Sequence, residues 1–365
     1  MNKNNYAIIM AGGVGSRFWP WSKTEKPKQF LDVLGTGKTL IQQTYERINR
    51  ICPRENILII TNALYADTIA EQITDIPHEN ILSEPKGRNT APCIAFGAFK
   101  IQRHNPNANI LVAPSDHVIL KEDLFVKVVE EAFEYAQQNE TLMTIGIDPH
   151  KPETGYGYIQ STGEILKSSP GEWQLSEVTA FREKPDLEKA KEFLKSGDYF
   201  WNAGIFVWPV RTIIRAFEKH LPTMYSQFDA FETDFNTKNE EAAVRTIFNQ
   251  CESISIDYGI MEKAKNVCVI STDIGWSDMG SWSALHEVSD KNENGNASNT
   301  AKSLFYNSNN VLLRALDNKV TVIEGLEDYI VVEEENALLI CRKQNEQLIK
   351  QFVKDVGDKF GEEYI

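Results

Sequence analysis

The feature that most limits how this chain can fold is a regular alternation of short apolar runs and longer amphipathic segments in its N-terminal half. The runs are rich in aliphatic and β-branched residues and occupy residues 6–10, 56–61, 109–113 and 142–147. Continuous apolar runs are typical of parallel strands that are buried on both faces. Apolar residues recur at helical spacing in the segments between them, residues 39–50, 63–73, 91–104 and 121–139. The alternation predicts an α/β fold with a Rossmann-like, doubly wound sheet whose ligands bind at the carboxyl ends of the strands.

A second pattern begins near Lys151, where short alternating segments rich in glycine and aromatic residues replace the β-α alternation. The clearest examples are residues 155–159 and 200–209. Alternation of this kind is typical of antiparallel strands. We therefore expect a mixed sheet, with antiparallel strands added by the second half of the same domain.

The C-terminal part is expected to form a small separate module. Residues 289–300 have the Asn, Gly and Ser content of a linker. Closely spaced β runs between residues 310 and 341 indicate a β-rich, left-handed β-helix-like module, which a helix over residues 345–356 would close. The predicted boundaries are thus residues 1–288 for the large domain, 289–300 for the linker and 301–365 for the module.

Charge and cysteine content exclude several classes of protein. The formal net charge of -14 is spread along the 365 residues without a basic stripe, so nucleic acid is not an expected partner. The apolar run near the N-terminus is too short for a signal peptide or a membrane span, so no membrane association is expected. The five cysteines are widely spaced and odd in number, which argues against disulfides and zinc and favours a cytoplasmic protein. A homo-oligomer, such as a dimer, is compatible with the sequence.

A glycine-rich turn follows the first apolar run and reads A-G-G-V-G-S-R. It is not the dinucleotide fingerprint, which would need glycine at Phe18, nor a P-loop, which would need glycine at Asp32. Its glycines let backbone N–H groups approach phosphate oxygens, and Arg17 adds a fixed guanidinium. A Pro-bounded loop then brings Lys28 back toward the same place. For the glycines alone, a turn without a ligand is an equally good interpretation.

Other polar segments follow predicted strands or turns. Residues 83–92 precede a helix, and Asn89 or Thr90 can cap it. Asp116 follows the third apolar run, and Asp278 lies in a tight turn that contains glycine. Taken singly, each acid is more often a surface or capping residue, but two carboxylates together suit Mg²⁺.

The run "AGGVGSRFWPWSKTEKPKQF" resembles the sugar-nucleotide pyrophosphorylase family, and within it the members that join GTP to mannose 1-phosphate. The form E-P-x-x-R-N-T-A-P in residues 84–92 is similar to the same members. The resemblance implies nucleotidyl transfer from GTP to mannose 1-phosphate, which yields GDP-mannose and pyrophosphate. It implies catalytic roles for Arg17 and Lys28, and Mg²⁺, or Mn²⁺ or Co²⁺ in its place, on Asp116 and Asp278.

The same resemblance implies two sets of binding residues. Those implied for the nucleotide are Ala11, Gly12, Gly13, Gly15, Ser16, Arg17, Glu84, Pro85, Arg88, Asn89 and Ser115. Those implied for the sugar phosphate are Gly155, Tyr156, Glu183, Lys184, Asn202 and Gly204. The segment around Asp257 also matches the family and is expected to be a wall of the pocket.

Two other functions stay open at this point. The chain could use another nucleoside triphosphate and sugar 1-phosphate, or it could be a catalytically silent homologue that binds GDP-mannose and regulates a partner. A silent binder would have no need of Arg17, Lys28, Asp116 and Asp278 together. Larger relatives carry an additional isomerase domain, for which these 365 residues leave no room, so isomerase activity is not expected.

Overall fold

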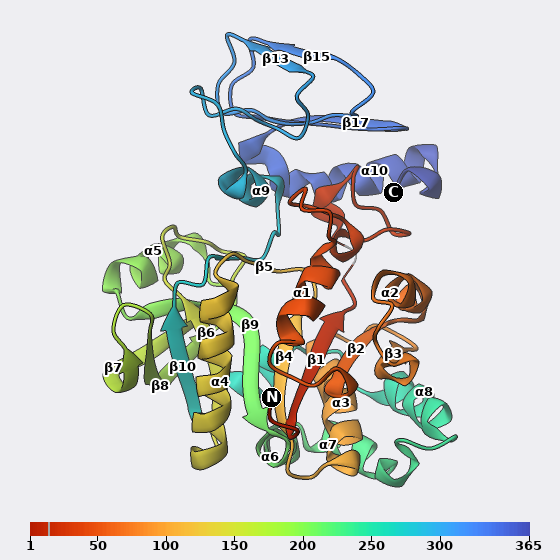
Figure 1. Ribbon diagram of the computed structural model, residues 1–365, viewed down its shortest axis with the longest axis vertical. Coiled ribbons are helices and arrows are strands. Elements are labelled where there is room, and N and C mark those ends of the chain that lie inside the picture. Colours follow the sequence, from red (N-terminus) through yellow and green to blue (C-terminus); the bar gives the residue numbers. More distant parts are fainter. Residues whose placement is uncertain (14) are drawn as a thin grey trace. The chain divides into compact units, whose positions relative to one another are not determined.

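The computed structural model describes residues 1–13 and 15–365. The described chain clusters into two compact units (Figure 1). The first consists of Met1–Gly12, Tyr45–Ser115 and Ile119–Trp276, and the second of Gly13–Thr44, Asp116–Val118 and Ser277–Ile365. Each unit therefore gathers segments that are far apart in the sequence.

The first unit is built on one large mixed sheet. In chain order its strands are β1 (Asn5–Ala11), β2 (Ile57–Asn62), β3 (Ile81–Glu84), β4 (Asn109–Pro114), β6 (Leu142–Ile147), β7 (Tyr158–Ser169), β8 (Trp173–Arg182), β9 (Tyr199–Pro209) and β10 (Val267–Thr272). Their order across the sheet is β3-β2-β1-β4-β9-β6-β10-β8-β7. The four strands expected from the apolar runs are β1, β2, β4 and β6, so those predictions are confirmed. The short strands β5 (Val118–Ile119) and β11 (Trp276–Ser277) lie outside this sheet.

Strand direction fixes which loops share an edge of this sheet. β1 pairs in parallel with β2 and β4, and β3 pairs in parallel with β2. β9 is antiparallel to both β4 and β6, which it separates. The carboxyl ends of β1, β3, β4 and β6 therefore lie along one edge, where the residues after Ala11, Glu84 and Pro114 emerge.

Helices pack on the sheet of this unit. They are α2 (Ala66–Gln72), α3 (Thr90–His104), α4 (Glu122–Asn139), α5 (Leu187–Ser196), α6 (Val210–His220), α7 (Pro222–Asp229) and α8 (Glu240–Gln250), with α1 (Leu40–Ile48) leading into the unit. α3 and α6 share one buried cluster with Ile8, Val112 and Phe206 of the sheet. α4 packs on β4, β6 and β9 outside that cluster (Figure 1). The helices predicted over residues 91–104 and 121–139 are α3 and α4.

The second unit contains a β-helix module. Its strands are β12 (Ala297–Ser298), β13 (Ser303–Tyr306), β14 (Leu312–Arg314), β15 (Thr321–Glu324), β16 (Tyr329–Glu334) and β17 (Ala337–Arg342). β12, β14 and β16 stack in parallel register, as do β13 and β15. The expected β-rich module with stacked rungs is therefore confirmed.

One apolar core joins this module to the segment that carries the glycine-rich motif. Phe18, Trp19 and Leu31 belong to the same buried cluster as Leu312 and Ile330 of the module. The helices α9 (Trp282–Val288) and α10 (Ile349–Phe360) contribute Trp282 and Ile349 to this cluster. Among the described residues, no helix is both long and apolar enough to cross a lipid bilayer.

Candidate active site

The second unit holds the ammonium group of Lys28 among three oxygen atoms. Lys28 is 3% exposed and opens the 3₁₀ turn Lys28–Phe30. Its Nζ lies 2.9 Å from Asp116 Oδ2 and donates to the backbone carbonyls of Asp278 and Met279 at 2.8 and 2.9 Å. We call Arg17, Lys28, Asp116 and Asp278 the phosphate-side cluster. The structure thus brings together the predicted catalytic lysine and both predicted metal ligands.

Two further contacts shape this cluster. Arg17 Nη1 donates to the carbonyl of Gly280 at 3.2 Å, while its buried Nε has no hydrogen-bond partner among the described residues. Gly15 has a φ of +65°, and a Cβ atom there would lie 2.7 Å from Lys28 Cβ. Gln29 Nε2 donates to the carbonyl of Gly13 at 2.9 Å. The glycine-rich turn is therefore packed directly on Lys28, and only glycine fits at position 15.

The rest of the predicted nucleotide loop is placed as follows. Gly12 is exposed, and Ala11 ends β1 with its carbonyl accepting from Thr61 Oγ1 at 2.9 Å. The backbone N–H of Ser115 donates to the carbonyl of Met10 at 3.0 Å, which ties the ends of β4 and β1 together. Ser16 begins a 3₁₀ turn with Arg17. Val14, the middle residue of the motif, lies outside the described residues.

The two acids of the phosphate-side cluster have the chemistry of magnesium ligands. Although burial opposes its ionisation, the Lys28 ammonium and the neighbouring His117 lower the pKa of Asp116 below its ordinary value. Asp278 Oδ1 accepts from the backbone N–H of Gly280 at 2.8 Å within its turn. Oxygen ligands of this kind fit Mg²⁺. Within residues 1–13 and 15–365, no three His, Cys, Asp or Glu side chains gather as a ligand set, so substrate oxygens or water would complete the coordination.

In the first unit, Glu84 is a buried carboxyl group at the end of β3. Burial raises its pKa to about 7, although a hydrogen bond with Cys93 opposes the shift. Its Oε1 has no hydrogen-bond partner in the described part of the chain. A buried carboxyl oxygen that lacks a partner is costly, because it has lost water without gaining a donor. Glu84 is therefore available to accept hydrogen bonds from a ligand.

The other residues of this segment are differently engaged. Arg88 donates to the carbonyls of Phe248 and Asn249 at the end of α8, at 3.0 and 3.2 Å. Asn89 has a φ of 69° and caps α3 by accepting from the N–H of Thr90 at 2.8 Å. Pro85 is exposed. These contacts hold the segment in shape, whereas Glu84 keeps one oxygen without a partner among the described residues.

The predicted sugar-binding residues also meet in the first unit. Lys184 Nζ pairs with Glu183 Oε1, and Asn202 Nδ2 donates to Asp257 Oδ1 at 2.9 Å. Burial, and next the charge of Glu183, raise the pKa of Asp257 to about 6. We call Glu183, Lys184, Asn202 and Asp257 the sugar-side cluster. It presents two neighbouring carboxyl groups, an amide and an ammonium.

Backbone geometry leaves space at this cluster. A Cβ atom on Gly157 would lie 2.5 Å from Glu183 Oε2, and that oxygen is buried with no hydrogen-bond partner among the described residues. The ring of Tyr156 packs edge-on against Trp201, with ring centres 5.2 Å apart. The Gly204 N–H donates to Asn202 Oδ1 at 3.1 Å, and the Gly155 N–H donates to Glu153 at 3.2 Å. Asn202 is thus bonded to Asp257 and Gly204, whereas Gly155 bonds to Glu153 and Tyr156 packs on Trp201.

Asp257, which was expected to be a wall of the pocket, also accepts a hydrogen bond from Asn202. It begins a π-helical turn, Asp257–Met261, and such turns occur frequently at functional sites. The available signal was its segment, which matches the family and carries an acid followed by Tyr258 and Gly259. Nothing in the spacing of the sequence indicates that this acid meets Asn202 and Glu183.

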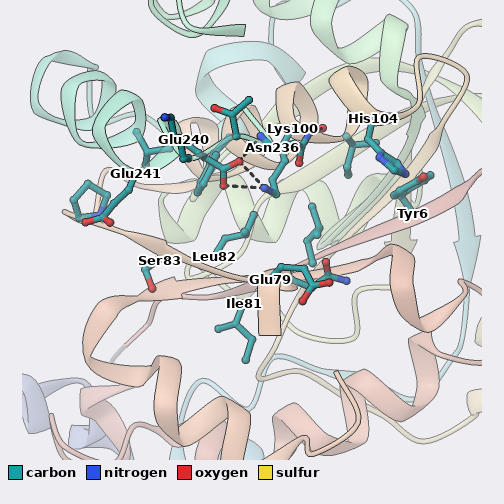
Figure 2. A pocket seen from close by; sticks show the side chains of 18 of the residues that line it. Tyr6, Glu79, Ile81, Leu82, Ser83, Lys100, His104, Asn236, Glu240 and Glu241 are labelled. Carbon is teal, nitrogen blue, oxygen red and sulfur yellow. Dashed lines mark hydrogen bonds and ion pairs between the residues drawn. The ribbon is translucent and has the colours of Figure 1, made fainter. Parts of the chain in front are cut away.

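A large cavity lies elsewhere in the first unit. Its volume is about 1220 Å³, and it is lined by residues of β3, α3 and α8 (Figure 2). Figure 2 shows the side chains of Lys100 and Glu240, which both line the cavity, pointing toward each other, with the ammonium 2.6 Å from a carboxylate oxygen. Of the predicted binding residues that the structure describes, only Pro85 lines this cavity. The cavity and the two clusters are therefore composed of different residues.

The raised pKa of Asp257 leads to a testable effect on stability. The folded state holds the proton of the Asp257 carboxyl group more tightly than the unfolded state does. The free energy of unfolding therefore falls as the pH rises from about 4 to 6, and it stays lowered by the full amount above pH 6. Asp257→Asn removes the charge and keeps the acceptor for Asn202. It should raise the free energy of unfolding by about 1–3 kcal/mol near pH 8, and the gain should shrink below pH 6.

Urea denaturation at several pH values measures this difference. The matched control is Asp290→Asn, because Asp290 is exposed. An Asp257→Asn gain that does not change between pH 8 and pH 5 would contradict the raised pKa.

Comparison with known proteins places the chain in a family. The family model described as nucleotidyl transferase matches residues 6–295, and the model described as MannoseP isomerase/GMP-like beta-helix domain matches residues 305–356. A mannose-1-phosphate guanylyltransferase of Salmonella montevideo is 38% identical over 358 residues, which cover 96% of this chain and 73% of that protein. Another, of Escherichia coli, is 38% identical over 364 residues, with the same coverage of 96% and 73%.

A solved structure is similar to this chain over nearly its whole length. It is that of a Thermus thermophilus protein described as a mannose-1-phosphate geranyltransferase. Its TM-score is 0.82 at 28% identity, and the match covers 97% of this chain and 99% of that one. The family models, the relatives and this structure lead to one conclusion: the chain belongs to the mannose-1-phosphate guanylyltransferase family of nucleotidyl transferases.

Proposed function

We propose that this protein joins GTP to mannose 1-phosphate and forms GDP-mannose and pyrophosphate. The observation that carries the proposal is the buried ammonium of Lys28, which contacts the Asp116 carboxylate and the Asp278 backbone carbonyl. Lys28 lies in the motif segment that resembles GTP-dependent members of the family. Relatives at 38% identity bear the name of this activity. The five cysteines are free and buried, which fits a reducing compartment, so we place the reaction in the cytoplasm.

The chemistry needs positioning and charge neutralisation rather than a general base. A phosphate oxygen of mannose 1-phosphate attacks the α-phosphorus of GTP and forms a new P–O bond. The bond between the α-phosphorus and the oxygen that bridges it to the β-phosphorus breaks, and pyrophosphate leaves with that oxygen. The attacking phosphate is already largely a dianion near neutral pH. Arg17 and Lys28 lower the barrier by holding positive charge near the phosphoryl oxygens.

The contacts of Lys28 indicate how it reaches a phosphate. An ammonium group has three N–H donors, and Asp116, Asp278 and Met279 accept from all three. Lys28 therefore has to exchange one partner for a phosphate oxygen. Asp116 is the partner that can leave, because its side chain is partly exposed, whereas the two carbonyls belong to a fixed turn.

We propose Asp116 and Asp278 as ligands of Mg²⁺, with Mn²⁺ and Co²⁺ as substitutes. When bound, the ion supplies positive charge against the oxygens of the triphosphate. Asp116 is suited to this role because Lys28 keeps it ionised in the folded protein. Asp278 is suited because its turn holds the carboxylate in one orientation through Gly280.

The sugar-side cluster supplies the groups that bind a hexose phosphate. Carboxylates accept hydrogen bonds from neighbouring sugar hydroxyls, and Glu183 Oε2 and Asp257 are two such acceptors in one place. Lys184 provides a cation for the sugar phosphate. Asn202 orients Asp257 through a hydrogen bond, so the sugar would contact the other polar atoms of the cluster.

The direct test is turnover with a matrix of GTP, ATP, UTP and dTTP against mannose 1-phosphate and glucose 1-phosphate. Pyrophosphate release should be fastest with GTP and mannose 1-phosphate. Faster release with a different nucleotide would contradict the proposal that GTP is the nucleotide substrate. Binding of GDP-mannose without any turnover would favour the silent regulatory homologue instead.

Lys28→Ala should lower kcat by about 10²–10³-fold, because it removes the cation nearest the reacting phosphate. Pyrophosphate release under saturating substrates measures the effect, and circular dichroism verifies that the variant is folded. Lys26→Ala is the matched control, since Lys26 is exposed in the same loop and should retain wild-type turnover. A kcat for Lys28→Ala within about twofold of wild type would remove Lys28 from the mechanism.

Glu84→Gln tests which side chain reads guanine. A carboxylate can accept from both N1–H and N2–H of guanine, whereas an amide offers one acceptor and places a donor against the base. The variant should lose about 10–10³-fold in kcat/KM for GTP and gain relative preference for UTP or dTTP. Glu71→Gln on α2 is the exposed control. If Glu84→Gln keeps the nucleotide preference of wild type, Glu84 is not the group that recognises guanine.

A further inference from the structure

A series of stacked side chains leads from the β-helix module to the ammonium group of Lys28. The guanidinium carbon of Arg314, on β14, lies 3.1 Å from the ring centre of Trp21. Trp21 stacks on Trp282 with ring centres 6.2 Å apart, and Trp282 packs on Phe18 at 4.7 Å. Lys28 Nζ lies 5.9 Å from the ring centre of Phe18. We call Trp21, Trp282 and Phe18 the aromatic stack.

The position of Arg314 is costly for a cation. Burial lowers its pKa to about 10, and only partial compensation comes from Glu334, whose Oε1 lies 3.7 Å from Nε. That Nε has no hydrogen-bond partner within the described residues. The Arg314 side chain is 24% exposed, and a partly buried charge with incomplete pairing destabilises the fold unless another contact replaces the lost water. Here the face of Trp21 replaces part of it through a cation–π contact, for which a planar guanidinium is well suited.

The aromatic stack holds both segments that meet at Lys28. Phe18 and Trp21 precede Lys28 in the motif loop, and Trp282 closely follows the turn of Asp278 and Met279. Trp282 Nε1 also donates to the carbonyl of Trp19 at 3.3 Å. A shift of Trp21 would therefore move the loop against the turn whose two carbonyls hold the ammonium.

We infer that Arg314 is a positioning residue for nucleotidyl transfer. By stacking on Trp21, it fixes the aromatic stack and hence the place of the Lys28 ammonium relative to Asp116 and Asp278. The inference rests on the proposed function, because the effect on rate presumes that Lys28 acts on the phosphates. It gives the β-helix module a part in the reaction although Arg314 itself touches no reacting atom.

The test compares Arg314→Met and Arg314→Lys with wild type. Arg314→Met should lower kcat by about tenfold or more, since a small displacement of a catalytic group is costly in rate. KM for mannose 1-phosphate should stay within about twofold, because the sugar-side cluster is unchanged. Arg314→Lys keeps the charge but loses the planar stacking, so its loss should be smaller.

Arg342→Met is the matched control. Arg342 belongs to the same module and also lies over an aromatic ring, that of Tyr329 at 5.6 Å, but it is exposed and Tyr329 is not part of the stack. It should retain wild-type kcat. The inference is overturned if kcat of Arg314→Met is within about twofold of wild type, or if Arg342→Met loses as much. If Arg314→Met does not fold, the same criteria apply to Arg314→Lys.

Limited proteolysis supplies a readout that does not depend on turnover. Lys23 lies between Trp21 and Lys28, so trypsin cleavage after Lys23 reports how firmly the loop is held. Cleavage should be about threefold faster or more in Arg314→Met than in wild type and Arg342→Met. If wild type turns over no substrate pair, the proposed function fails, and this measurement alone decides the inference. Equal cleavage rates would then overturn it.

Discussion

The interaction on which the rest of the phosphate-side cluster depends is the triple contact of the Lys28 ammonium. One partner is a carboxylate and two are backbone carbonyls of adjacent residues, Asp278 and Met279. Met279 has a φ of 44° and a fully buried side chain, so its backbone is held in an uncommon conformation by packing. Apolar packing thereby fixes two of the three oxygen atoms that hold the Lys28 ammonium.

Much of the first unit could be predicted because local pattern and tertiary structure agree there. The runs that became β1, β2, β4 and β6 are apolar on both faces, and the glycine-rich turn follows β1 as expected. β3 was missed because it has only four residues and includes Ser83 and Glu84. The position of β9 between β4 and β6 could not be predicted from the sequence either, because strand order depends on long-range pairing rather than on local composition.

The candidate site was predictable to a different degree in each cluster. The loop that contains Arg17 and Lys28 is contiguous, so its residues could be proposed together. The meeting of Asp257 with Asn202, and of Arg314 with Trp21, joins residues 55 and 293 positions apart, and no periodicity encodes either.

The shared core of the second unit has a consequence for how this protein can be divided. Phe18, Trp19 and Trp282 pack against Leu312 and Ile330, which belong to the β-helix module. A fragment cut before the module would leave these large rings exposed to water, and an exposed apolar patch of this kind promotes aggregation. Protein engineering that swaps modules between relatives therefore has to transfer the motif loop together with the β-helix, because the two segments form one structural part despite their distance in the sequence.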